Sequence, residues 1–136
     1  MRNMVAVFME NKSGKLAKIT EVLAKNNIDI ILIDIEDRQQ FGLCRILTAD
    51  PIKARDVLYD ANFTVALEKT VVVEIDDKVG SMAHLAKIMD EEGINVNEAS
   101  GSIIEKGKKA IFSFKTDNPE KLEAVLVERG IKVLDL

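Results

Sequence analysis

The amino-acid sequence contains an internal duplication, and this feature constrains the fold more than any other. Residues 5–30 align with residues 71–96 at a constant offset (71 − 5 = 66). Further along, Pro51 aligns with Pro119, so the offset has grown by two residues (119 − 51 = 68). A longer hairpin turn in the second copy would produce this change. A solenoid needs at least about three repeats, so two copies indicate a paired module with an interface between the copies.

Composition limits the possible functions. The chain has 136 residues, so each half is near the lower limit for an independent hydrophobic core. We therefore expect the halves to stabilise each other or to pack against a second chain. Lys and Arg total 19 against 23 Asp and Glu, a net charge of −4 that argues against a nucleic-acid-binding surface. The longest apolar stretch, residues 30–33, is too short to span a membrane.

The cysteine count bears on compartment and chemistry. Cys44 is the single cysteine, which excludes an intrachain disulfide and a thiolate metal cluster and fits a reducing, cytoplasmic setting. No leader peptide is expected, because the first residues lack a charged segment followed by an apolar one. We also expect no cofactor and no metal site, since the sequence has no phosphate-binding glycine-rich loop and no nucleophile motif.

Each half has the pattern strand, helix, strand, strand, helix, strand. Residues 15–25 and 81–91 carry apolar side chains at helical spacing, with Leu16 and Met82 in the first turns, and Met82 is expected to face the core with Leu85, Ile88 and Met89. Asp50-Pro51 and Asn118-Pro119 are typical starts of the second helices. The expected strands are residues 4–9, 28–36, 43–48 and 63–67, then 70–75, 94–105, 110–116 and 131–136.

This order predicts an α+β protein with two tandem ferredoxin-like βαββαβ domains, each an antiparallel sheet with both helices on one face. The junction at residues 66–69 is short, so we expect rigidly placed domains at residues 1–68 and 69–136. The second strand of the first half is apolar on both faces at residues 30–33, which predicts a covered sheet and a homo-oligomer, most simply a homodimer.

The loop after each first strand is the most distinctive part of the sequence. Residues 11–16 read Asn-Lys-Ser-Gly-Lys-Leu, and residues 77–82 read Asp-Lys-Val-Gly-Ser-Met. Gly14 and Gly80 stand where a helix begins, and free N–H groups at a helix N-terminus attract a carboxylate. A short polar side chain such as Asn11 or Asp77 can bond an amino group. A turn that merely caps a helix uses the same residue types, and both interpretations stay open.

Together with the element order, the pattern [N/D]-x-x-G-x-[L/M] followed by [I/V]-[D/N]-[I/V] resembles the ACT domain. That family consists of small regulatory modules that bind amino acids. The resemblance covers nearly the whole chain as two tandem ACT domains, and is closest to small stand-alone tandem-ACT proteins. It implies a site formed by the loop residues and by one residue opening each second strand: Asn11, Lys12, Ser13, Gly14, Leu16, Asp29, Asp77, Lys78, Val79, Gly80, Met82 and Asn95.

The departures from the family pattern bear on the ligand. Serine-sensing members use one Asn in this loop and a second Asn at the start of the second strand; here the pairs are Asn11 with Asp29 and Asp77 with Asn95. The apolar residues Met9, Leu16, Ile75 and Met82 around these loops favour a branched or otherwise apolar amino acid. Asp29 is equally explained as a solvated strand residue.

The resemblance therefore predicts a non-catalytic regulatory protein that binds a small amino acid at ACT–ACT interfaces, signals amino-acid status and acts on an enzyme of amino-acid metabolism. An alternative is a stand-alone regulatory subunit, like that of acetolactate synthase, that acts by protein–protein contact alone. A small ferredoxin-like enzyme is the third hypothesis, but the sequence offers no convincing titratable cluster for it.

Overall fold

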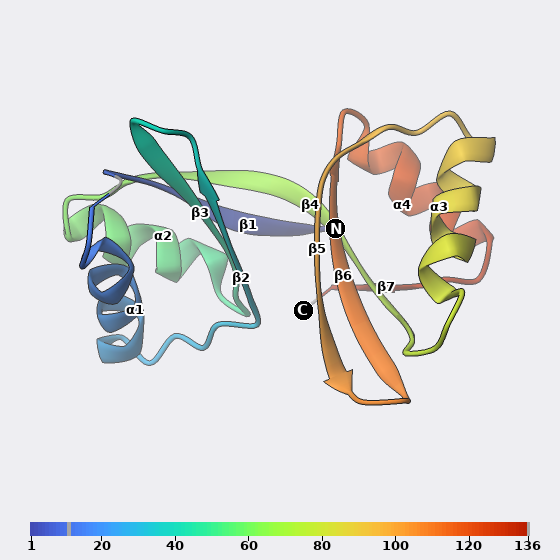
Figure 1. Cartoon of the computed structure of the whole chain (residues 1–136), viewed down its shortest axis with the longest axis horizontal. Coiled ribbons are helices and arrows are strands. Elements are labelled where there is room, and N and C mark those ends of the chain that lie inside the picture. The colour runs from blue at the N-terminus through green and yellow to red at the C-terminus, as the bar shows by residue number, and fades with distance from the viewer. Residues whose placement is uncertain (11, 136) are drawn as a thin grey trace. The chain divides into compact units, whose positions relative to one another are not determined.

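The structure is a computed structural model that describes residues 1–10 and 12–135. The elements follow one another as strand, helix, strand, strand, helix, strand, and the pattern then recurs (Figure 1). In chain order they are β1 (Arg2–Glu10), α1 (Lys15–Lys25), β2 (Leu32–Asp37), β3 (Phe41–Leu47), α2 (Pro51–Asp60), β4 (Thr64–Asp76), α3 (Ser81–Glu91), β5 (Val96–Glu105), β6 (Lys109–Thr116), α4 (Pro119–Glu128) and β7 (Lys132–Leu134).

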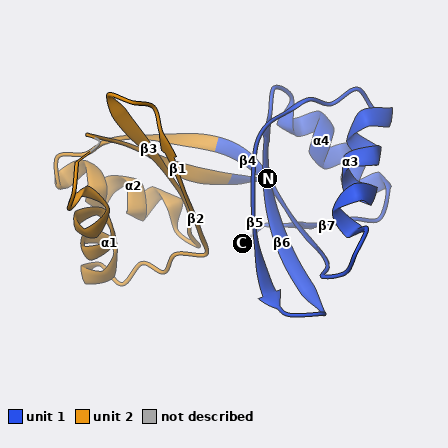
Figure 2. Ribbon diagram, in the orientation of Figure 1, with its two compact units in different colours: residues 1–2, 69–136 blue, residues 3–68 orange. Residues whose placement is uncertain are grey.

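The chain divides into two compact units (Figure 2). Residues 3–68 form the N-terminal unit, and residues 1–2 with 69–136 form the C-terminal unit. The strand order is β2-β3-β1-β4 in the first unit and β7-β4-β6-β5 in the second. β4 belongs to both because it is one strand, whereas the sequence predicted separate strands at residues 63–67 and 70–75. The junction Ala-Leu-Glu-Lys contains no glycine, proline or other turn former that would interrupt it.

The core of each unit lies between its sheet and its two helices. In the N-terminal unit the register pairs Val5 with Ile46 and Val7 with Cys44, and all four side chains are fully buried. Alternation along the strands places them on the face that α1 and α2 cover. In the C-terminal unit Val71, Val73 and Phe114 share the core with residues of α3 and α4. The predicted α+β fold with both helices on one face is thus confirmed.

The duplication extends to the backbone conformation. Four positions of positive φ occur in each repeat, and they correspond one to one: Gly14 (88°) with Gly80 (91°), Asn27 (56°) with Gly93 (66°), Gln39 (69°) with Gly107 (77°), and Asn62 (70°) with Gly130 (77°). Glycine, asparagine and glutamine differ in how easily they enter this left-handed region. Because three of these four pairs among the described residues keep the conformation with different residue types, the fold imposes it.

The two extra residues of the second repeat lie at the hairpin between β5 and β6, where the sequence analysis placed them. Asp37 pairs with Gly42 in the first repeat and Ile103 pairs with Ala110 in the second, so residues 104–109 take the place of residues 38–41. The turns differ, since Arg38 N donates to Phe41 O in the first hairpin, whereas Lys108 N donates to Glu105 O in the second. β5 also has two irregularities in its pairing with β6, one between Val96 and Glu98 and one between Ile103 and Glu105. Each leaves one residue without a cross-strand partner, as in a β-bulge. The insertion is therefore accommodated partly by the irregularity after Ile103 and partly by a longer turn at residues 106–108.

No helix in the described ranges 1–10 and 12–135 is long and apolar enough to cross a membrane.

Candidate functional site

The described residues of the loops after β1 and β4 share a backbone hydrogen bond and the conformation of a glycine. Lys12 N bonds to Glu10 O at 2.8 Å, and Lys78 N bonds to Asp76 O at 3.1 Å. Gly14 and Gly80 then occupy the N-cap positions of α1 and α3, and no described side chain caps either helix. Lys15 N bonds to Lys12 O and Ser81 N to Lys78 O, and the next N–H groups of each uncapped first turn remain available to an acceptor such as a carboxylate. Each loop can therefore bind an anion through its backbone.

The side chains predicted for the ligand are mostly exposed. This holds for Lys12, Ser13, Leu16, Lys78, Val79 and Met82 and for both loop glycines, while Asn11 lies outside the described residues. Leu16 is 41% exposed and Met82 is 39% exposed. The expectation that Met82 points into the core is wrong, because neither side chain joins the core of its unit. Both loops thus present an apolar side chain to the surface.

Asp77 has a structural partner. Its carboxylate accepts a hydrogen bond of 2.7 Å from Gly107 N, and its own N–H donates to Lys108 O at 3.1 Å. These bonds hold the loop after β4 against the turn between β5 and β6. One carboxylate oxygen of Asp77 is therefore engaged within the unit, as expected if the loop serves as a structural turn.

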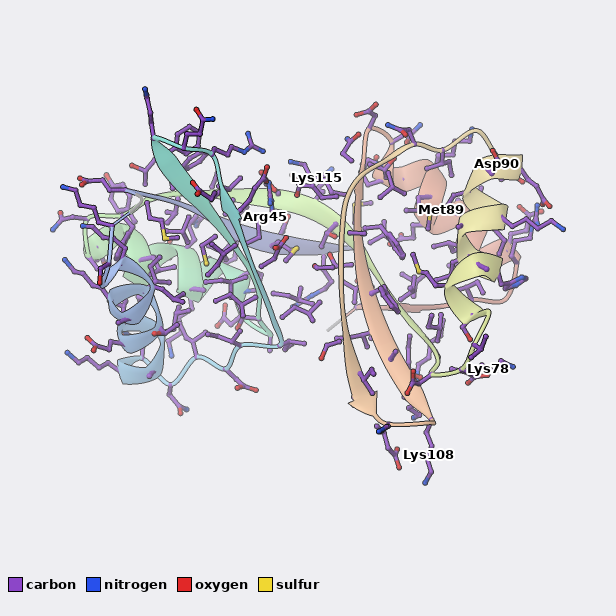
Figure 3. The ribbon with its side chains drawn as sticks, viewed as in Figure 1. Arg45, Lys78, Met89, Asp90, Lys108 and Lys115 are labelled. Carbon is purple, nitrogen blue, oxygen red and sulfur yellow. The ribbon has the colours of Figure 1, made fainter. Side chains whose placement is uncertain are left out.

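The two parts of the predicted site lie far apart within a unit. Asp29 and Asn95 are exposed and precede β2 and β5, so they follow the C-terminal ends of α1 and α3. α3 has 11 residues, which corresponds to a length of about 16 Å. Figure 3 shows Lys78 beside the start of this helix and Asp90 near its end. No unit brings its own loop and its own strand start together.

An apolar groove of about 310 Å³ connects these two ends in the C-terminal unit. It lies between α3 and β5 and is lined mainly by Met82, Ala86, Met89, Ile94, Val96 and Ala99. Met82 is next to the loop, and Ile94 is next to Asn95. The sequence analysis did not identify this groove; its signal is the pair of small residues, Ala86 and Ala99, where a larger side chain would fill the space.

A larger cavity of about 620 Å³ lies on another side of the same loop. Lys78, Val79 and Gly80 line it together with residues from the end of β4, from α3 and from the start of β7. The N-terminal unit has a cavity of about 290 Å³ at the corresponding place, lined by Phe8 to Glu10, Lys15, Lys18 and residues 61–64. The predicted loop residues of the C-terminal repeat thus border both a groove and a cavity.

Charges around the loops are paired locally. Lys12 Nζ lies 2.8 Å from Glu10 Oε2, and this hydrogen bond holds the pKa of Glu10 below its usual value and raises the pKa of Lys12.

Burial, with a smaller contribution from Asp34, raises the pKa of the Cys44 thiol to about 11, so this thiol is protonated at neutral pH. The described residues contain no group of three or more His, Cys, Asp or Glu side chains able to hold a metal ion.

The chain is similar to a known protein family and to several solved structures. The family model described as "ACT domain pair" matches residues 2–135. The structure resembles that of protein BT0572 from Bacteroides thetaiotaomicron, with a TM-score of 0.90, 30% identity, and 97% of this chain and 90% of that chain covered. It also resembles the regulatory subunit of aspartate kinase from Thermus thermophilus, with a TM-score of 0.68, 14% identity, and coverage of 93% and 91%. The second likeness shows a common fold alone. No curated protein matches the chain.

Proposed function

Because the chain belongs to the ACT domain pair family, we propose that it is a regulatory protein that binds a small amino acid at interfaces between ACT units and signals amino-acid status. Family membership confirms the resemblance that the loop motifs indicated. We further propose that the protein acts without catalysis in the cytoplasm and that its fold serves to bring two ligand-binding surfaces together.

One observation carries this proposal: the loop and the start of the second strand lie at opposite ends of one groove. Met82 marks the loop end of the groove, and Ile94, next to Asn95, marks the other. Two ACT units that face each other in antiparallel fashion along such grooves would place the loop of one against the strand start of the other. A homodimer provides this arrangement by twofold symmetry. The site would then be complete only at an interface.

The chemistry of the two ends is complementary to an amino acid. The uncapped first turn of α3 suits the ligand carboxylate. An oxygen of the side chain at the strand start, Asp29 or Asn95, can accept from the ligand ammonium group. Leu16 and Met82 offer exposed apolar surface beside the loops, which favours an apolar side chain on the ligand. The proposed ligand is therefore a small apolar amino acid.

A thermal-shift screen against the twenty amino acids tests the proposal directly. A ligand at 100 times its Kd adds about 2.7 kcal/mol to the free energy of unfolding, which is a shift of several degrees. We expect Val79→Asp to weaken this stabilisation, because Val79 is fully exposed and the new charge repels the ligand carboxylate. Val127→Asp is the matched control, since Val127 is an exposed valine on α4. Equal ligand response in both variants would contradict a role for the loop.

Mixed dimers test whether the site spans two subunits. Val79→Asp and Asn95→Ala each disable one half of the proposed site. Mixing the two variants restores one intact site in each mixed dimer, because the unaltered loop of one subunit meets the unaltered Asn95 of the other. Recovery of ligand binding, measured by calorimetry, is the expected result. Failure to recover, in dimers shown by mass spectrometry to be mixed, would place the site within one chain.

A second function is supported by two exposed isoleucines. Ile103 and Ile104 on β5 are 57% and 59% exposed, an apolar surface suited to a partner protein. A separate enzyme of amino-acid metabolism is the partner we propose, as the name of the aspartate kinase subunit with the same fold illustrates. A flat amino-acid screen together with copurification of one defined enzyme, lost in Ile103→Ser, would favour a stand-alone regulatory subunit over an amino-acid sensor.

A further inference from the structure

Each unit has a cavity at the equivalent position of its repeat. The cavity in the C-terminal unit lies beside Gly130, and the cavity in the N-terminal unit is smaller. Both lie between the end of the first strand, the start of the first helix and the start of the last strand. His84 occupies the position of Lys18, and Ile131 occupies that of Phe63. Gly130 and Asn62 share a left-handed backbone, with φ of 77° and 70°. The cavities therefore differ through their side chains.

The N-terminal cavity is narrowed by the protein's own side chains. The Phe63 ring belongs to the core of its unit and is 9% exposed. Lys18 Nζ lies 5.8 Å from the centre of this ring, which is within the range of a cation–π contact. This place in the fold therefore accommodates a phenyl ring.

In the C-terminal unit the corresponding place is open. Ile131 is smaller than phenylalanine and His84 is shorter than lysine, and the cavity volume is about 620 Å³ against about 290 Å³. Ile75, Leu85 and Ile131 supply an apolar lining. A cavity of this size lies within the range that holds small ligands. A ligand with an aromatic ring would restore the packing that Phe63 provides in the other repeat.

The charges at the rim select the polar part of the ligand. Glu74 is paired with Lys132 at 3.3 Å, and Asp76 is paired with Lys78 at 3.8 Å. Lys109, which also lines the cavity, forms no ion pair with any side chain in the described part of the chain. The rim therefore offers a free cation, while both of its carboxylates already have partners. A carboxylate on the ligand would be matched, and an ammonium group would not.

We infer that this cavity is a second binding site, for a small molecule that joins an aromatic ring to a carboxylate. The site lies wholly within the C-terminal unit. It shares the loop at residues 78–80 with the proposed interface site, but it uses neither Asn95 nor a second subunit. The ring occupies the space that Phe63 fills in the other repeat, and the carboxylate faces Lys109. Each chain has one such site, because Phe63 already occupies the position of the ring in the N-terminal unit.

Binding of 3-phenylpropanoate, followed by calorimetry and by two-dimensional NMR, tests this inference. We expect saturable binding of one molecule per chain, with the largest shifts at Ile131 and Lys109. The neutral amide 3-phenylpropanamide should bind at least tenfold more weakly. L-Phenylalanine should also bind more weakly, because its ammonium group lacks a free acceptor. No saturable binding of 3-phenylpropanoate, or equal binding of the amide or of L-phenylalanine, would overturn the inference.

Exchanging side chains between the repeats gives a matched pair of variants. Ile131→Phe with His84→Lys copies the narrowed N-terminal cavity and should reduce the affinity for 3-phenylpropanoate at least tenfold. Phe63→Ile with Lys18→His copies the open cavity and should leave the C-terminal site unchanged. Unaltered binding in the first double variant, with its fold verified by circular dichroism, would show that the cavity is not the site.

Ligand binding at the interface site and ligand binding in this cavity can be lost separately. Asn95→Ala should abolish stabilisation by the amino acid found in the thermal-shift screen and leave 3-phenylpropanoate binding intact. Lys109→Gln should weaken 3-phenylpropanoate binding alone. Loss of 3-phenylpropanoate binding in Asn95→Ala would contradict the placement of this ligand in the cavity, because Asn95 does not line it.

Discussion

The carboxylate of Asp77 accepts a hydrogen bond of 2.7 Å from the backbone N–H of Gly107. The bond joins residues 30 positions apart and connects the loop after β4 with the turn between β5 and β6. The loop that borders both the groove and the cavity is therefore held in place from outside its own segment.

Replacing Asp77 by Ala should lower the free energy of unfolding by about 1 kcal/mol, because one charge-assisted hydrogen bond at a partly exposed position is lost. The amide hydrogen of Gly107 should also exchange faster with solvent. Asp76→Ala is the control, since Asp76 is exposed and pairs only weakly with Lys78. Unchanged exchange at Gly107 in Asp77→Ala would mean that the bond does not form in solution.

Gly101 on β5 faces the ring of Phe112 on β6, and the two residues are cross-strand partners. A Cβ atom at position 101 would lie 2.4 Å from two carbons of that ring. Gly101→Ala should therefore displace the ring and destabilise the protein by about 1–3 kcal/mol, measured by chemical denaturation. Ser102→Ala, at the next exposed position of the same strand, should change stability by less than about 0.5 kcal/mol. Similar values for the two variants would refute this packing argument.

Arg45 is 4% exposed and lies near three carboxylates, those of Asp34 (3.9 Å), Glu36 (3.4 Å) and Glu68 (3.5 Å). Arg45→Met would leave these carboxylates facing one another, and should cost about 2 kcal/mol at neutral pH, since the acids are partly exposed and retain some hydration. Protonation of a carboxylate relieves this repulsion, so the stability of the variant relative to wild type should recover as the pH falls.

The control for this cluster is Arg38→Met. Hydrogen bonding and charge from Arg38, with a smaller contribution from Arg45, hold the pKa of Glu36 below its usual value of 4.5. Removing Arg38 leaves the buried guanidinium in place, so the loss at neutral pH should be smaller than for Arg45→Met. If the two variants lost equal stability and had the same pH dependence, Arg45 would have no special role.

The Cys44 thiol should be unreactive in the folded protein and should make stability decline in alkali. Burial raises its pKa from 9.0 to about 11, so the unfolded chain loses the thiol proton at a lower pH than the folded one. The resulting stability is complete below pH 9.0 and disappears as the pH rises toward about 11. Cys44→Ala should remove this alkaline slope. Rapid reaction of the native thiol with a disulfide reagent at neutral pH would contradict the buried environment.

The elements with strong local patterns were predictable from sequence. The predicted helices at residues 15–25 and 81–91 have the observed bounds of α1 and α3, because apolar spacing and the preceding glycine act within a few residues. The start of β2 was not predictable in this way. Apolar residues from position 28 onward predicted a strand, but β2 begins at Leu32, since pairing with Leu47 of β3 decides where the ladder starts.

The candidate site was predictable in part. The loop motif pointed to the uncapped helix starts at Gly14 and Gly80, and the ligand roles of the individual side chains remain predictions. Nothing in the motif indicated that Asp77 binds Gly107 or that Leu16 and Met82 are exposed, because those facts depend on segments distant in the chain.

The sequence by itself determined that this protein consists of two copies of one βαββαβ unit, since repeated residues at fixed offsets and local turn chemistry are sufficient to specify the elements and their order. Only the tertiary structure decided how the copies differ. It divided the insertion in the second hairpin between an irregularity of β5 and the turn, and it showed Phe63 narrowing a cavity that Ile131 leaves wider. The physical reason is that periodicity is a property of neighbouring residues, whereas occupation of space depends on contacts between elements far apart in the chain.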